Sequence, residues 1–72
     1  MAWVQSVYSS MISEVGYDGD RSVLTIRFLN NGALWEYDGV DEGTAQALAN
    51  APSVGQMFLS EVKPAYAGRR VL

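Results

Sequence analysis

Side chains that could carry catalysis are scarce in this chain. Its 72 residues include no His and no Cys, which removes the commonest general base, the commonest transition-metal ligand and a thiolate nucleophile. The single lysine, Lys63, stands beside Pro64, where a helix has to end, and it cannot be grouped into a nucleophile, a base and an orienting residue. Asp18 and Asp20 flank a turn glycine and are too few for a calcium or magnesium cage. The sequence therefore predicts a protein that is not an enzyme and that holds no metal or cofactor.

Side chains suited to binding an anion are present instead. Two adjacent arginines near the C-terminus can donate charge-assisted hydrogen bonds to phosphate. A serine and a glycine at the start of a predicted helix could hold an anion, because backbone N–H groups are free there. An exposed aromatic ring could stack on a base, which contributes ~1–3 kcal/mol. The predicted ligand-binding residues are accordingly Tyr17, Tyr37, Ser53, Gly55, Arg69 and Arg70.

Each of these residues also has a purely structural explanation. Residues 53–56 match an S-x-x-Q capping box, so that Ser53 is also a candidate N-cap. The two C-terminal arginines are either a frayed tail or a phosphate clamp that reaches from one subunit to another. Trp35 and Tyr37 share a face with aliphatic residues, and aromatic residues dominate the cores of small domains. Both explanations stay open for each residue at this point.

A β-hairpin is predicted to position the aromatic pair. Residues 22–29 (SVLTIRFL) and 33–38 (ALWEYD) alternate apolar and polar side chains on either side of Asn31-Gly32, a strong signal for a two-residue turn. This turn predicts the cross-strand pairs Phe28–Trp35, Ile26–Tyr37 and Arg27–Glu36, the last as an ion pair on the solvated face.

The remaining elements complete an α+β domain. Residues 10–18 (SMISEVGYD) predict a weaker strand, in which Gly16 indicates a bulge or a close approach of backbones. Residues 41–51 and then 53–63 predict two short helices, separated by Pro52. The predicted fold is a three-stranded antiparallel β-meander followed by two short helices packed on one face.

A series of weak landmarks suggests a family. They are Gly16-Tyr17-Asp18, the aromatic pair in Trp35-Glu36-Tyr37, and then Val40, Leu48, Ala51, Ser53, Gly55, Phe58, Val62 and Tyr66. In their order and spacing, residues 10–66 resemble the KTSC domain, a short module named from the C-terminus of some lysyl-tRNA synthetases and also found as a stand-alone protein in bacteria and phages. The chain departs from the family at Trp35, where Tyr is usual, and at Asp41, where Pro is common. The resemblance implies this fold, and RNA binding has been suggested for the family.

The resemblance divides the chain into three parts. Residues 1–9 are predicted to be an N-terminal extension, residues 10–66 the KTSC-like domain, and residues 67–72 a basic C-terminal tail. A domain this small is marginally stable, and without disulfides or a metal a partner subunit is the stabilising device that is left. A homo-oligomer is therefore expected, with contacts from the extension, which suits a helical turn or an extra strand. The contact residues would be Trp3, Val4, Val7 and Tyr8.

Charge and hydropathy limit the partners. The net charge of −3 disfavours capture of a long nucleic-acid backbone, and no stretch predicts a membrane span or a signal peptide, so a cytoplasmic protein is expected. The predicted function is non-catalytic binding of a small, phosphate-bearing, nucleotide-type ligand. A phage-type protein would use such binding for immune evasion, as a sponge that sequesters a host nucleotide signal. The alternatives are a module that inhibits a host protein through a flat apolar patch at residues 3–7, and an RNA-binding module.

Overall fold

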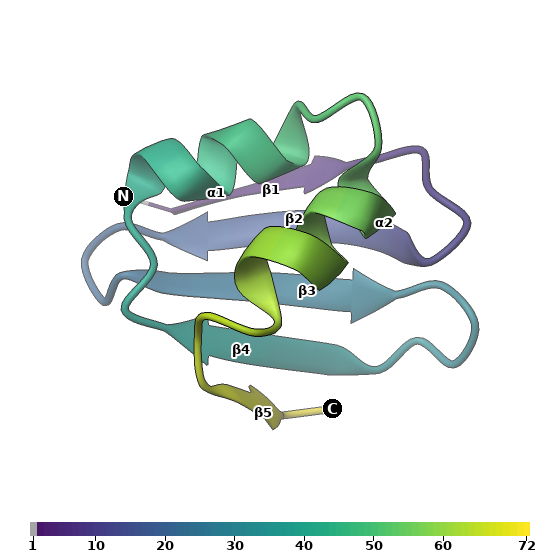
Figure 1. Ribbon diagram of the computed structural model, residues 1–72. Coiled ribbons are helices and arrows are strands. Elements are labelled where there is room, and N and C mark those ends of the chain that lie inside the picture. The colour runs from purple at the N-terminus through teal and green to yellow at the C-terminus, as the bar shows by residue number, and fades with distance from the viewer. Residues whose placement is uncertain (1) are drawn as a thin grey trace.

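The protein folds into a five-stranded antiparallel sheet with helices on one face (Figure 1). The computed structural model describes residues 2–72. The strands follow one another across the sheet in chain order. They are β1 (Ala2–Ser6), β2 (Ile12–Asp18), β3 (Val23–Phe28), β4 (Leu34–Asp38) and β5 (Gly68–Arg70). The helical elements are α1 (Glu42–Ala49), α2 (Val54–Met57) and the π-helix η1 (Phe58–Val62). The α+β class is confirmed, but the sheet has five strands rather than the expected three.

The two additional strands come from the ends of the chain. β1 lies in the predicted N-terminal extension and pairs with β2, whereas β5 lies in the predicted basic tail and pairs with β4. Trp3 and Val7 pack against the core of this chain, while Val4 and Tyr8 are exposed. Both ends therefore belong to the folded sheet, and two of the four expected oligomer contacts are used within the chain.

The predicted register of the hairpin is wrong by two residues. Ile26 pairs with Trp35, and Leu24 pairs with Tyr37. The turn is longer than expected: the Gly32 N–H donates to the Phe28 carbonyl (3.0 Å), and only Gly32, not Asn31, has a positive φ (68°). A two-residue type I′ turn needs positive φ at both central residues. Because a shift of two residues preserves the alternation of faces, the apolar and polar faces remain as predicted.

β2 departs from regular geometry at one position. Its pairing with β3 shifts between Ile12 and Glu14, which marks a β-bulge around Ser13. Ile12 and Val15 are consequently both buried, which simple alternation does not allow. Gly16 is not the bulge. A Cβ at that position would overlap Thr25 Oγ1, so Gly16 marks a close approach of neighbouring strands.

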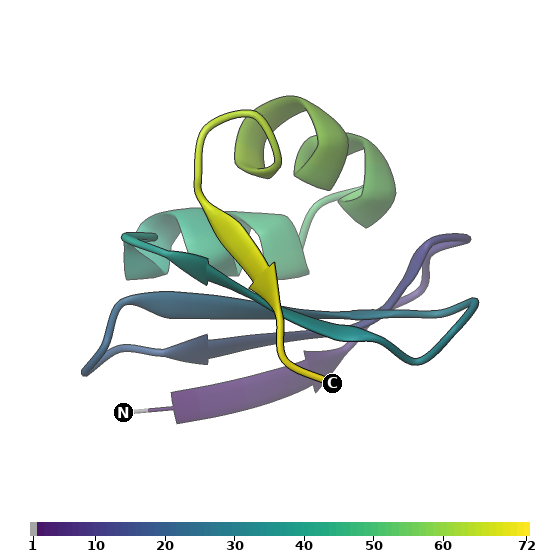
Figure 2. The same ribbon diagram turned by 90° about the horizontal axis from the view of Figure 1, so that it is seen from below.

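The helices cover one face of the sheet, and the apolar core lies between the two layers (Figure 2). Ser53 is the N-cap of α2, and its hydroxyl oxygen accepts a hydrogen bond from the Gln56 N–H (3.4 Å). Val54, Phe58 and Val62 project into the core from the continuous turns of α2 and η1. In η1 the Lys63 N–H donates to the Phe58 carbonyl (2.9 Å), a hydrogen bond that spans five residues. Within residues 2–72, no helix has the length and apolar character needed to cross a bilayer.

Candidate functional site

An open cleft of about 350 Å³ lies between η1 and the β3–β4 hairpin. We call it the aromatic cleft. It is lined by Met11, Phe28, Asn30, Asn31, Ala33, Trp35, Tyr37, Phe58, Leu59 and Lys63. The strands supply its floor, η1 supplies one wall, and the hairpin loop supplies two amides at its mouth. Apolar walls with a few polar groups at the rim are typical of small-molecule sites.

The floor of the aromatic cleft is a packed array of rings. Phe58 meets Phe28 edge-to-face, with ring centroids 5.6 Å apart, and meets Tyr37 in the same way at 5.5 Å. Trp35 lies nearly parallel to Tyr37 at 6.4 Å. Phe58 and Tyr37 are buried, whereas Phe28 and Trp35 are partly exposed. Trp35 and Phe28 are therefore the aromatic surfaces that a ligand can reach.

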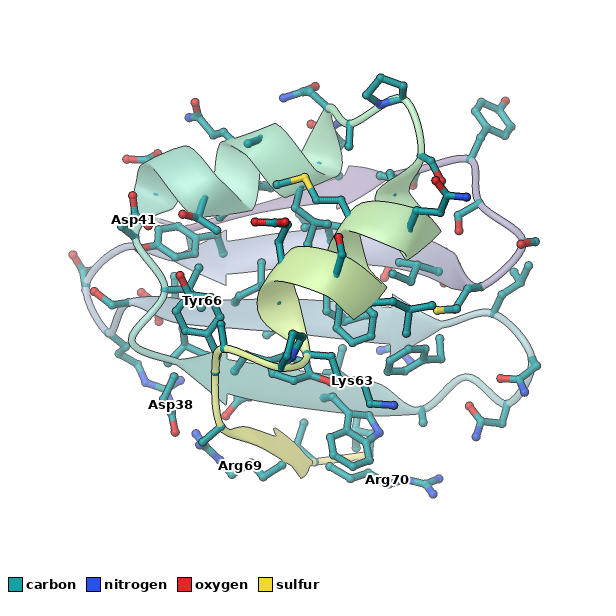
Figure 3. All side chains as sticks on the ribbon, in the orientation of Figure 1. Asp38, Asp41, Lys63, Tyr66, Arg69 and Arg70 are labelled. Atoms are coloured by element: carbon teal, nitrogen blue, oxygen red, sulfur yellow. The ribbon has the colours of Figure 1, made fainter. Side chains whose placement is uncertain are left out.

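Two cations border this aromatic surface. Lys63, at the end of η1, lines the aromatic cleft. Arg70 projects from β5 (Figure 3). It is the β5 partner of Trp35, so the two side chains lie beside each other on the same face of the sheet. The Arg70 Nε donates to the Leu72 carbonyl (2.9 Å). Across residues 2–72, neither Lys63 nor Arg70 forms an ion pair with an Asp or Glu side chain.

The other three cations are neutralised on the opposite face of the sheet. Arg69 donates to Glu36 (2.7 Å) and Asp38 (2.5 Å), and hydrogen bonding to Asp38 is the main cause that raises the pKa of Arg69. Arg21 approaches Glu36 (3.7 Å). Arg27 pairs with Glu14 (3.3 Å) instead of the expected Glu36, because the hairpin register is shifted. These arginines already have carboxylate partners.

Of the six predicted ligand residues, one lines the aromatic cleft and one lies beside a residue that lines it. Tyr37 lies in the floor, where burial raises the pKa of its hydroxyl, and Arg70 lies beside Trp35. Tyr17 is buried instead, and its hydroxyl donates to the Val40 carbonyl (2.6 Å). Arg69 points to the opposite face of the sheet, because neighbouring residues on a strand alternate.

The predicted anion site at residues 53–55 does not join the arginines within one chain. Ser53 and Gly55 border a separate hollow of about 270 Å³ beside the β1–β2 connection, and no Lys or Arg lines it. A Cβ on Gly55 would lie 3.3 Å from Ser9 Oγ, so this glycine allows the connection to pack against α2. Ser53 and Gly55 thus serve capping and packing in the described chain.

Sequence reasoning missed Lys63 and Trp35 as site residues. Lys63 was weighed as a catalytic residue and Trp35 was weighed with Tyr37 as a core or ligand-contacting residue, but neither was included among the six predicted ligand residues. Their proximity depends on how η1 crosses the sheet, which a local pattern does not encode. Among the residues that the structure describes, no three His, Cys, Asp or Glu side chains gather into a potential metal site.

A family model and a solved structure both match this chain to one family. The KTSC domain family matches residues 8–66 of this chain. A crystal structure of a KTSC domain protein from Yersinia pestis has a TM-score of 0.90 and 33% sequence identity, and the match covers 100% of both chains. An uncharacterized protein of Stutzerimonas stutzeri (strain A1501) is 36% identical over 59 residues, which is 82% of each chain.

Proposed function

We propose that this chain, which belongs to the KTSC domain family, binds a nucleotide-type ligand in the aromatic cleft and releases it chemically unchanged. One observation carries the proposal. Within the described residues, the two cations that lack a carboxylate partner are those that border the partly exposed rings of the cleft. A ligand that joins a planar base to phosphate suits this combination.

The base would pack against Trp35 and Phe28. Both rings are partly exposed, and the buried Phe58 and Tyr37 pack against them. Stacking of this kind contributes ~1–3 kcal/mol per base and tolerates different bases. The side chain of Asn30, at the mouth of the cleft, offers an amide donor and a carbonyl acceptor to the edge of the base.

The phosphate would lie between Lys63 and Arg70. The Nε of Arg70 is engaged by the Leu72 carbonyl, which fixes the guanidinium and leaves its two terminal nitrogens to donate. Lys63 directly follows η1 and Arg70 lies in β5, so the two charges approach β4 from different segments. Each charge-assisted hydrogen bond to phosphate would contribute ~1.5–3 kcal/mol.

The residues of the aromatic cleft support binding rather than turnover. Tyr37 has a pKa raised by burial, so it stays protonated at neutral pH and is no general base. Lys63 is exposed at the rim, and no Ser, Thr or Cys is among the described residues that line the cleft. Tight binding without turnover would sequester the ligand, which is the action expected of a phage-type sponge.

The neighbouring arginines of β5 provide a matched test. Arg70→Ala should weaken nucleotide binding by about tenfold or more, because it removes a charged hydrogen bond worth ~1.5–3 kcal/mol. Arg69→Ala makes the same change one residue away on the opposite face and should leave affinity within about threefold, since charges there are screened from the cleft. Calorimetric titration against mono-, di- and cyclic nucleotides measures both.

The same titration distinguishes a free nucleotide from RNA, since both contain bases and phosphates. Short RNA and DNA oligomers are titrated as well, and preferential binding of RNA would identify the RNA-binding alternative, which uses the same cleft. Absence of any binding below the millimolar range, or equal losses in the Arg69 and Arg70 variants, would contradict the proposal. The protein-interaction alternative has less support, because Trp3 and Val7 pack on the core and the expected flat patch is reduced to Val4.

A further inference from the structure

The two edges of the sheet are protected to very different extents. β5 is three residues long and carries two arginines. A short edge strand and charged side chains both protect a sheet edge from pairing with another chain. β1 is five residues long (AWVQS) and contains no charge and no proline. Its pairing with β2 is regular over all five residues, so no bulge turns this edge away. β1 is therefore an edge that can accept another strand.

The backbone of β1 shows which groups are available. The Val7 N–H donates to the Ser13 carbonyl (3.1 Å), which makes Val7 a hydrogen-bonded partner of β2. Hydrogen-bonded and non-hydrogen-bonded pairs alternate along an antiparallel ladder. Trp3 and Gln5 therefore direct their backbone groups towards β2, whereas Val4 and Ser6 direct theirs outward. The side chain of Val4 is 70% exposed as well.

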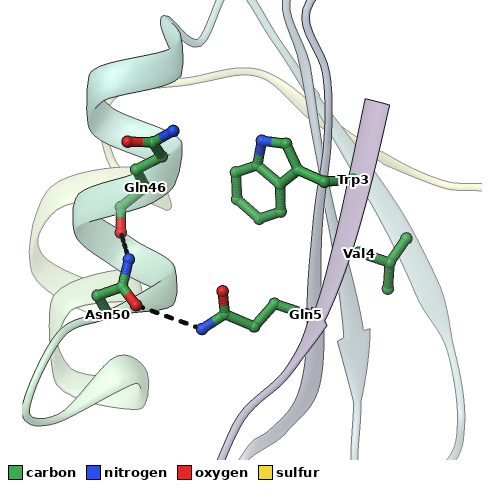
Figure 4. A pocket seen from close by; sticks show the side chains of 5 residues that line it. All are labelled: Trp3, Val4, Gln5, Gln46 and Asn50. Carbon is green, nitrogen blue, oxygen red and sulfur yellow. Dashed lines mark hydrogen bonds between the residues drawn. The ribbon is translucent and has the colours of Figure 1, made fainter. Parts of the chain in front are cut away.

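An unsatisfied donor lies beside the same edge. The indole Nε1 of Trp3 is buried without a hydrogen-bond partner, the one such side-chain atom among residues 2–72. The Trp3 side chain also borders an open cleft of about 320 Å³ between β1 and α1, which is lined by Trp3, Val4, Gln5, Gln46 and Asn50. Figure 4 shows Trp3 and Gln5 projecting from β1 towards α1 while Val4 points away.

We propose that two copies of this chain pair through β1, antiparallel and about a twofold axis at Val4, to form one continuous ten-stranded sheet. The outward backbone groups of Val4 would bond to those of Val4 in the second copy, and Ala2 would pair with Ser6. Trp3 would then face Gln5 of the second copy on the α1 side. This twofold arrangement makes both partners use identical surfaces.

The Trp3–Gln5 pair explains why a second copy fits better than an arbitrary strand. The Gln5 Nε2 donates to the Ala49 carbonyl (3.1 Å) and to Asn50 Oδ1 (3.4 Å), which orients the amide and leaves its carbonyl oxygen to accept. The unpartnered Trp3 N–H needs such an acceptor. Because Trp3 and Gln5 are opposite each other in this register, the twofold axis satisfies the donor of each copy. β1 has no charge, so self-pairing brings no like charges together.

Sedimentation equilibrium of the full chain, without nucleotide, tests this proposal. A reversible monomer–dimer equilibrium should appear between about 1 µM and 1 mM. Val4→Lys places two ammonium groups at the twofold axis and should weaken the dimer at least tenfold. Leu29→Lys makes a similar change on an exposed side chain in the hairpin loop and should leave the dimer unaffected. Both positions are exposed in the monomer, so neither variant should lose its circular dichroism spectrum or melting transition.

A second measurement checks the register. In ¹⁵N-labelled protein the indole N–H resonance of Trp3 should move with concentration and exchange more slowly in the dimer, while that of Trp35 should not. A protein that stays monomeric throughout the range overturns the proposal, even if β1 accepts a strand of another protein. A dimer that Val4→Lys leaves intact overturns it as well. Neither measurement involves a nucleotide, so a result that overturns the dimer leaves the proposed function untouched.

Discussion

The two faces of the sheet differ in whether their cations have carboxylate partners. On the open face, Arg21 and Arg69 form a connected set of ion pairs with Asp18, Glu36 and Asp38, and Arg27 forms a separate pair with Glu14. On the helix-covered face, Lys63 and Arg70 border aromatic rings and have no such partner within the described chain. The same alternation that separates apolar from polar side chains thus separates neutralised cations from available ones.

This difference shows that a count of basic residues does not locate an anion site. Arg69 and Arg70 are neighbours in the sequence, yet one contacts two carboxylates and the other lies beside Trp35. Fully matched charges have little to gain from a ligand, because binding would first have to break existing pairs. We therefore expect substitutions on the covered face to change the free energy of unfolding most, and substitutions on the open face to change it little.

The largest expected effect is at the centre of the covered face. Phe58→Ala should lower the free energy of unfolding by about 3–5 kcal/mol, because it empties the ring contacts that hold η1 on the sheet. Leu59→Ala, at the next residue but 46% exposed, should cost less than about 1 kcal/mol. Urea denaturation followed by tryptophan fluorescence measures both. Similar losses in the two variants would show that the covered face is not the main source of stability.

An intermediate effect is expected where β5 crosses the aromatic floor. A Cβ on Gly68 would overlap the ring of Tyr37 and lie 2.7 Å from its Cδ2. Because Tyr37 is buried and cannot easily move aside, Gly68→Ala should cost about 1–3 kcal/mol as β5 is displaced. Arg70→Ala, in the same strand, removes atoms from an exposed side chain instead of adding one against Tyr37, so it serves as the control and should have a melting temperature close to that of the unmodified protein. Equal shifts in melting temperature would argue that β5 is not held against Tyr37.

The smallest effect is expected on the open face. Glu36→Gln removes the carboxylate shared by Arg21 and Arg69, yet it should cost no more than about 1 kcal/mol, since both arginines are half-exposed and Arg69 keeps Asp38. Denaturation at low and high salt measures this cost, which should shrink further as salt screens the pairs. A larger loss of unfolding free energy that does not depend on salt would show that the open face contributes as much to stability as the covered face.

The sequence predicted best those features that depend on neighbours in the chain. The N-cap at Ser53, the break between two helices around Pro52 and the apolar face of the central strands all follow from local chemistry, and the structure confirms them. The hairpin register was wrong because registers that differ by two residues bury the same face. A longer turn with a single left-handed residue, Gly32, was the alternative that the Asn31-Gly32 motif concealed.

Features that depend on distant pairing were not predictable in the same way. β5 is only three residues long, and its pairing with β4 joins residues more than thirty positions apart, such as Glu36 and Arg69. Had residues 68–70 been identified as a strand, the alternation of side chains would have placed Arg69 and Arg70 on opposite faces. Lys63 and Trp35 likewise meet only through the path of η1 over the sheet.

The π-helical turn has a consequence for how relatives of this chain can differ in length. A hydrogen bond that spans five residues holds one more residue than an α-helical turn, so a single-residue deletion within Phe58–Val62 could be absorbed by conversion to an α-helix. Such a deletion would keep Val54 and Phe58 in the core, and it would leave the residues that follow near their present places, because the residue removed is the extra one of the π turn. Lys63 would then keep its place at the edge of the aromatic cleft. The same deletion in a regular α-helix would instead rotate everything that follows by about a quarter of a turn.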